Sequence, residues 1–189
     1  MELWDIYDEN RIRTGQTAER GAQIPAGGYH IIVHVALINS RGQMLIQKRH
    51  AAKRGWPGLW DISAGGCAVA GENSRQAASR ELFEELGVDD EGRMYRILTV
   101  EFEGGFDDIY VLKKDLEPEG FTLQEEEVSE VKWADESEIA ELIESGAFVP
   151  YHKSHLALIF DMALRPADFG GSAGKSGTCR GIRVEKTFE

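Results

Sequence analysis

Gly66 to Val88 reads GCAVAGENSRQAASRELFEELGV, and the rest of the chain is organised around this stretch. Asn73 and Ser74 are typical N-cap residues, and Gly87 is a typical helix stop. The pattern therefore predicts a helix over about residues 73–86.

Three glutamates share one side of this predicted helix, because Glu81 lies three residues before Glu84 and four before Glu85. Carboxylates this close raise one another's pKa unless a positive charge lies among them. Oxygen ligands without His or Cys suit a hard divalent cation, Mg²⁺ or Mn²⁺, which also binds phosphate oxygens. Arg80 is placed to orient a carboxylate, either Glu84 or Glu72. The alternative for a charge cluster alone is a solvated acidic surface.

Glycines and one arginine stand at fixed offsets from these carboxylates: Gly-x5-Glu-x7-Arg-Glu-aliphatic-x-Glu-Glu-x-Gly-aliphatic. This pattern resembles the signature of the Nudix hydrolase family, and every specified position is filled. The resemblance implies an α/β (α+β) fold, a Nudix-type α/β/α sandwich with a mixed central sheet. It also implies a metal-dependent pyrophosphohydrolase that cleaves a nucleoside-diphosphate-type or other diphosphate-containing small molecule.

The resemblance also assigns roles within the signature. Glu84 and Glu85 are expected to bind the metal, and Glu81 is either a further ligand or the base that deprotonates water. Gly65 is expected to lend a backbone carbonyl to the metal, which its lack of a side chain permits. Glu72 is either another ligand or the partner of the signature arginine.

A downstream carboxylate often completes such a site. The run Glu125-Glu126-Glu127 and the pair Asp107-Asp108 are candidates, and each of these residues has a solvated surface role as its alternative. We select Glu127 because it leads into a predicted strand.

Basic and aromatic residues between the first strands and the signature are candidates for binding substrate. Arg49 and Lys53 are expected to contact its phosphates. Trp60 is placed to stack on a base or another ring, with packing as the alternative. Cys67 is expected to be an inert small side chain, because no His or Lys motif accompanies it.

The composition of the chain indicates its domain organisation, its partners and its compartment. A chain of 189 residues with 29% charged and 42% hydrophobic residues is typical of one soluble domain, here residues 1–165, followed by a Gly/Ser-rich tail at 166–189. A net charge of −12 disfavours a nucleic-acid polymer or an anionic membrane as partner. The N-terminus lacks signal-peptide features and two cysteines form no framework, which predicts a cytoplasmic protein. A homodimer is compatible with this composition.

Periodicity and turn residues predict the other elements. The expected elements are strands at 3–8 and within 11–28, a hairpin of 29–38 and 44–49, a short strand at 59–63, a hairpin of 94–103 and 106–113, a strand at 127–133, and helices at 135–145 and 151–164.

The run from His30 to Glu72 is similar to the Nudix branch that contains the isopentenyl diphosphate isomerases and isomerase-like hydrolases. In the isomerases a catalytic Cys stands at the position of Gly65, and metal-binding His residues stand at the positions of Cys67 and Gln23. His30 alone matches their metal site. These mismatches, with the intact Arg-Glu-x-x-Glu-Glu pattern, favour hydrolysis over isomerisation. A non-catalytic sensor of nucleotides or diphosphates is the other alternative, and the complete set of acidic residues argues against it.

Overall fold

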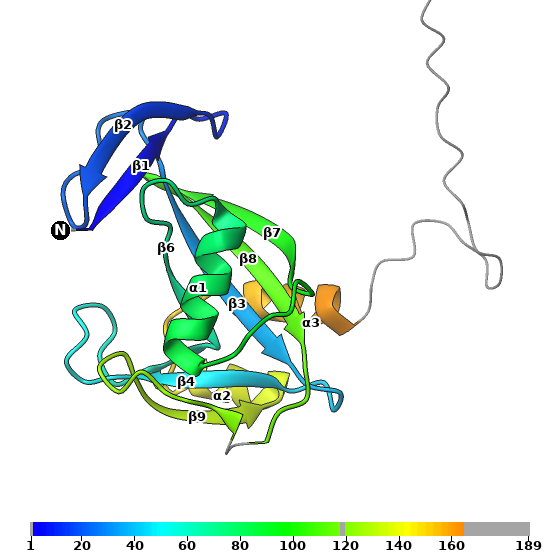
Figure 1. Ribbon diagram of the computed structural model, residues 1–189. Coiled ribbons are helices and arrows are strands. Elements are labelled where there is room, and N and C mark those ends of the chain that lie inside the picture. Colours follow the sequence, from blue (N-terminus) through cyan, green and yellow to red (C-terminus); the bar gives the residue numbers. More distant parts are fainter. Residues whose placement is uncertain (1, 118–119, 165–189) are drawn as a thin grey trace, which may run out of the picture.

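The computed structural model describes residues 2–117 and 120–164 of the chain, so the predicted tail at 166–189 lies outside the described residues. None of the helices in these two ranges is long and apolar enough to cross a membrane. The elements, in chain order, are β1 (Leu3–Tyr7), β2 (Arg13–Glu19), β3 (His30–Ile38), β4 (Met44–Arg49), β5 (Trp60–Ile62), β6 (Ala64–Cys67), α1 (Ser74–Leu86), β7 (Tyr95–Phe102), β8 (Gly105–Lys113), β9 (Val128–Ala134), α2 (Glu136–Glu144) and α3 (Lys153–Leu164) (Figure 1).

The central sheet is mixed, as predicted. Its strand order is β5-β4-β3-β8-β7, with β6 also paired to β3 and β9 to β4. β3 and β8 run parallel, and the other pairings are antiparallel. β1 and β2 form a separate two-stranded hairpin at one end of the molecule (Figure 1).

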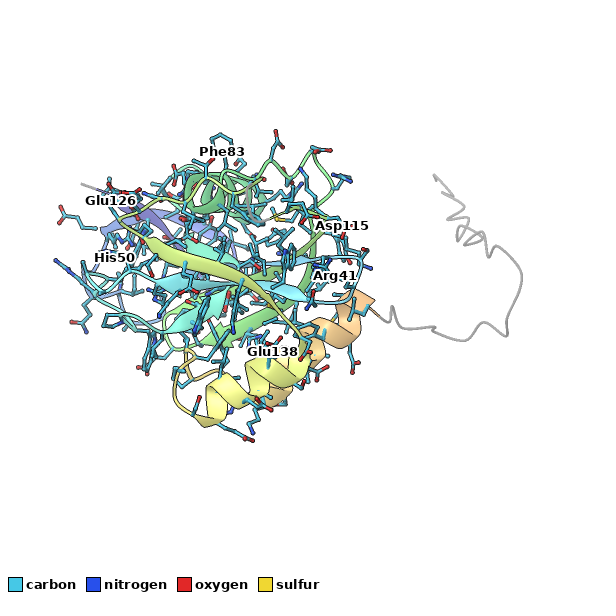
Figure 2. All side chains as sticks on the ribbon, turned by 90° about the horizontal axis from the view of Figure 1, so that it is seen from below. Arg41, His50, Phe83, Asp115, Glu126 and Glu138 are labelled. Carbon is cyan, nitrogen blue, oxygen red and sulfur yellow. The ribbon has the colours of Figure 1, made fainter. Side chains whose placement is uncertain are left out.

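Helices cover both faces of the sheet. In Figure 2 the helix that carries Phe83, α1, lies on one side of the strands, and α2, which carries Glu138, lies on the other. The side chains of β3 divide between two cores: Val33 and Val35 pack toward α1, whereas Ala36 and Ile38 pack toward α2 and α3. The predicted three-layer sandwich is confirmed.

The predicted hairpin of β3 and β4 closes only at its turn. The two strands pair at Ile38 and Met44, and beyond that point each takes another partner. β3 pairs with β6, which sets His34 opposite Gly65, and β4 pairs with β5. The strands therefore diverge, and the turn signal in the sequence could not show this because the divergence depends on the later strands.

Local signals fixed the ends of α1 correctly. The side chain of Asn73 accepts a hydrogen bond from the Gln76 backbone amide, and the side chain of Gln76 accepts one from the Asn73 backbone amide. Gly87 ends the helix in the left-handed region at φ 69°. The last helix begins at Lys153, two residues later than predicted. Tyr151 stays outside it, where its hydroxyl bonds Asp61.

Candidate active site

Two of the three α1 glutamates point into the protein. Glu85 is 2% exposed, and the side chain of Glu81 is 14% exposed. The side chain of Glu84 is 49% exposed at the helix surface. The buried stripe that includes Ala78 and Leu82 packs α1 against the sheet and so fixes this orientation.

Glu85 is a buried carboxylate held between two strands. Its Oε2 atom accepts hydrogen bonds from Nε2 of Gln47 at 2.8 Å and from the backbone amide of Gly65 at 3.1 Å. Burial, reinforced by the charge of Glu81, raises the pKa of Glu85 to about 7 even though nearby Lys53 opposes the shift. At neutral pH this carboxyl is poised between its neutral and charged forms.

Glu81 lies directly against Gly66 of β6. A Cβ atom added at Gly66 would clash with the Glu81 carboxylate, so the first glycine of the signature provides the room for this group. A Cβ at Gly65 would lie 2.6 Å from Cδ2 of His34 on the neighbouring strand. Burial raises the pKa of Glu81, while Arg80 acts against the shift. Both glycines are therefore required by close packing at the site.

Arg80 ties the signature together. Its guanidinium donates to Glu72 at 2.8 and 3.0 Å, to Glu81 at 2.8 Å, to Glu84 at 3.0 Å and to the Cys67 carbonyl at 3.0 Å. Of the alternatives left open by the sequence, the structure places both Glu72 and Glu84 with this arginine. One positive group thus joins α1 to the loop before it and to β6.

Lys53 and Glu127 meet Glu85 from the other side. The Lys53 ammonium contacts the Glu127 carboxylate and lies 3.6 Å from Oε1 of Glu85. The amide of His50 bonds the Glu127 carbonyl at 2.8 Å, which fixes the loop that carries Lys53. Figure 2 shows His50 and Glu126 at the same end of the sandwich. The structure thus brings Glu127 to the site.

The alternative pair Asp107-Asp108 has other partners. Asp107 bonds Nδ1 of His34, and Asp108 bonds Arg11. Arg49 donates to Asp61 at 2.9 Å and to the carbonyl of Gly55 at 2.9 Å. These three predicted residues therefore lie in internal polar networks.

Trp60 corrects one expectation. It is 9% exposed and packs in the core beneath α2 and α3. The ammonium groups of Lys48 and Lys132 lie over its ring, 5.7 and 5.1 Å from the centroid. This ring has a packing role instead of the substrate-stacking role that we expected, because β5 turns it into the core.

Gln47 is a residue of the site that was not predicted from the sequence. Its Nε2 holds Glu85, and its buried Oε1 has no partner among the described residues. A polar residue within the apolar run of β4 was the available signal, but its partner lies 38 residues away.

The donor set fits a hard divalent cation. Within residues 2–117 and 120–164 no three His, Cys, Asp or Glu side chains already stand at metal-binding distances. Basic groups lie among the carboxylates instead: Arg80 at Glu81 and Lys53 at Glu85. The carboxylate oxygens of Glu81 and Glu85 and the unpartnered oxygen of Gln47 are the kind of ligand that such an ion prefers.

Comparisons with known proteins identify the family and the fold. The sequence profile of the NUDIX domain matches residues 28–154. An uncharacterized Nudix hydrolase of Listeria monocytogenes is 45% identical over 153 residues, which cover 80% of this chain and 90% of the relative. A crystal structure from Deinococcus radiodurans has the same fold, with a TM-score of 0.70 and 24% identity over 87% of this chain and 100% of the other. Nudix enzymes generally use divalent metal ions.

A second kind of relative covers less of the chain. An isopentenyl-diphosphate Delta-isomerase of Streptomyces coelicolor is 38% identical over 86 residues, 46% of this chain and 44% of its own length. Burial raises the pKa of the Cys67 thiol to about 12, which favours its unreactive neutral form.

Proposed function

The chain belongs to the Nudix family, and from this premise we propose that it hydrolyses a pyrophosphate linkage in a small molecule with Mg²⁺ or Mn²⁺ bound at its α1 carboxylates. The observation that carries the proposal is the burial of Glu85 beside Glu81, at the glycines of β6. Two carboxylates buried together disfavour the folded state unless positive charge lies with them. Arg80 and Lys53 supply part of that charge, and a divalent cation would add to it.

In this proposal Glu84 and Glu85 hold the metal, with the carbonyl of Gly65 and the carboxylate of Glu127 completing the ligands. When bound, such ions neutralise phosphate oxygens and lower the pKa of a bound water. Gln47, on β4, holds the Glu85 carboxylate in place. Glu85 would therefore bind the metal ion without changing its orientation.

Glu81 is either a further metal ligand or the group that takes the proton from the attacking water. Its pKa is raised by burial, which makes it a better base near neutral pH than a solvated glutamate. Arg80 holds this carboxylate in place.

Two basic groups are proposed for the substrate phosphates. The Lys53 ammonium already lies beside Glu85 and Glu127. A modest movement of its side chain would bring the ammonium into contact with the phosphate oxygens of a bound diphosphate. Arg49 is anchored by Asp61 and contributes positive charge at the same loop. A nucleoside-diphosphate-type or other small diphosphate fits this arrangement, and a nucleic-acid polymer does not suit a chain of net charge −12.

The test is a panel of nucleoside triphosphates, dinucleotides, nucleotide sugars, coenzyme A and prenyl diphosphates, assayed with Mg²⁺ or Mn²⁺ and with excess EDTA. Mass spectrometry of the products identifies the cleaved bond. The proposal predicts metal-dependent release of two phosphate-bearing products from at least one compound. Full turnover in EDTA would contradict the metal site, and binding without turnover across the panel would indicate a sensor.

A further inference from the structure

A second polar cavity lies away from the carboxylate site. It has a volume of about 570 Å³ and is bounded by the N-terminal hairpin, the start of α1 and β7. Three arginines line it, Arg11, Arg13 and Arg96, and none of the described lining residues is acidic. The chain carries 33 acidic residues against 21 lysines and arginines, so a cavity walled by positive charge departs from the rest of the molecule.

Two of the three guanidinium groups share one carboxylate. Arg11 binds both oxygens of Asp108, at 2.9 and 2.6 Å, and Arg96 binds one of them at 3.0 Å. The side chain of Asp108 is fully buried beneath them. Asp108 thus fixes two guanidinium groups, and Nε of Arg13 lies 3.3 Å from Oδ2 of Asp5, so three positive charges meet two negative ones at the cavity.

The backbone of Arg11 is strained. Its φ is +62°, a left-handed conformation that is unfavourable for a residue with a side chain. The bidentate pair with Asp108 and the packing of the guanidinium 4.9 Å from the centre of the Phe106 ring offset this strain. The turn of the N-terminal hairpin is therefore tied to β8 by this one side chain.

The other two arginines keep hydrogen-bonding capacity. A guanidinium has five N–H donors, and Arg96 donates from Nη1 to Asp108 with 47% of its side chain exposed. Arg13 uses Nε for the Tyr7 hydroxyl and Nη2 for the Glu72 carbonyl, and 43% of its side chain is exposed. Both line the cavity and have N–H donors beyond those used in these bonds.

We propose that this cavity binds a phosphate monoester, with the phosphate at Arg96 and Arg13 and the organic part against Tyr7 and Ile31. Paired guanidinium groups match the oxygens of a phosphate. The first turn of α1 has no acidic residue, whereas that of α2 carries Glu136 and Glu138, so the start of α1 adds to the attraction. A volume of about 570 Å³ exceeds the needs of a free phosphate ion and suits a small organic molecule.

The cavity is separate from the proposed catalytic carboxylates. Glu81, Glu84 and Glu85 do not line it. Gln76, which does, precedes Glu81 by five residues of α1, about 8 Å at 1.5 Å per residue, and Ser74 precedes Glu85 by eleven, about 16 Å. Binding here therefore does not depend on hydrolysis.

The experiment is calorimetric titration of the metal-free protein in EDTA with phenyl phosphate, which has an aromatic ring and no anhydride bond, and with phenol as the uncharged control. We expect one saturable site for phenyl phosphate and none for phenol. Arg96→Gln and Arg13→Gln should each weaken the affinity about tenfold, the effect of losing one charge-assisted hydrogen bond.

Arg93→Gln is the matched control, because Arg93 lies three residues from Arg96, is similarly exposed and pairs with Glu91 outside the cavity. It should bind phenyl phosphate as the parent does, and so should Glu85→Gln. Absence of saturable binding, or parental affinity in both Arg96→Gln and Arg13→Gln, would overturn the proposal. Affinity that changes in Glu85→Gln would also overturn it, by moving the ligand to the catalytic carboxylates. Melting temperatures confirm that each variant is folded, and Arg13→Gln decides the matter if Arg96→Gln does not fold.

Discussion

The hydroxyl of Tyr151 lies 3.1 Å from Nε2 of His34 and donates a 2.9 Å hydrogen bond to Asp61. His34 belongs to β3 and Asp61 to β5, which lie on the two diverging halves of the sheet. Nδ1 of His34 bonds Asp107, and although burial alone would lower the pKa of His34, this carboxylate raises it to about 9. The connection before α3 thus closes the opening between the strands from the side opposite α1.

We expect Tyr151→Phe to lower the free energy of unfolding by about 1–3 kcal/mol, because it leaves Nε2 of His34 without its partner and removes one of the two hydrogen bonds to Oδ1 of Asp61. Urea denaturation at pH 7 measures the change. Tyr95→Phe is the control, since Tyr95 is 42% exposed on β7 and should alter stability much less. Equal effects of the two substitutions would show that the Tyr151 hydroxyl does not connect the strands.

Glu85→Gln and Glu84→Gln should each lower turnover by about 10²-fold or more, the scale of losing a key electrostatic group. Glutamine keeps the size of the side chain and removes the charge that holds a hard cation. In chelator the melting temperature of Glu85→Gln should be unchanged or raised, because a buried carboxylate disappears. Glu126→Gln, at an exposed position next to Glu127, serves as the control. Near-normal turnover in both helix variants would remove the basis for the metal site.

The close contact of Gly66 with Glu81 gives a separate prediction. Gly66→Ala should reduce turnover strongly while the protein stays folded, because the added methyl displaces the end of a flexible side chain and not the backbone. Gly120→Ala is the control, since a Cβ there would meet only Leu116 at 3.8 Å. Steady-state kinetics and circular dichroism together separate the two effects. Unfolding of Gly66→Ala would mean that the glycine serves the fold instead of the carboxylate.

The sequence predicted what depends on local pattern. Asn73 and Gly87 delimit α1 through hydrogen bonds within a few residues, and the four-residue spacing of Glu81 and Glu85 placed these two on one side. The spacing could not predict how deeply each glutamate is buried. Glu85 is buried and Glu84 exposed although they are adjacent, because the packing of the α1 stripe against the sheet decides which one turns inward.

Contacts between distant segments account for what the sequence did not predict. Gln47 reaches Glu85 only because β4 leaves β3 after the turn, and this divergence depends on the glycine-rich β6 pairing with β3. Two glycines in four residues weaken any strand signal for β6. Trp60 lies in the core because β5 pairs with β4 and bridges to Phe148. Each of these outcomes depends on pairing between distant strands, which the periodicity of a single segment cannot predict.

Cys67→Ala distinguishes hydrolysis from a thiol mechanism. Burial holds the pKa of this thiol near 12, so little thiolate forms at neutral pH, and we expect turnover within a few-fold of the parent. The same kinetic assay is run with Glu85→Gln. Loss of activity in Cys67→Ala with retention in Glu85→Gln would favour chemistry like that of the isomerases.

Acid stability tests the buried carboxylate beneath the arginine cavity. Burial alone would raise the pKa of Asp108, but hydrogen bonds from Arg11 and Thr99 lower it to about 2, below its ordinary value of 3.8. A depressed pKa stabilises the folded state above pH 4, and this contribution is lost as the pH falls from about 4 toward 2. A shift of this size corresponds to about 2 kcal/mol.

Asp108→Asn should therefore be less stable than the parent at pH 7 and should lose less stability between pH 4 and pH 2.5. Urea denaturation at a series of pH values measures both effects. Glu126→Gln is the control, because Glu126 is exposed and does not line the arginine cavity, so this variant should follow the acid profile of the parent. Parallel pH profiles for Asp108→Asn and the parent would show that Arg11 does not depress the pKa of this carboxyl in the folded protein.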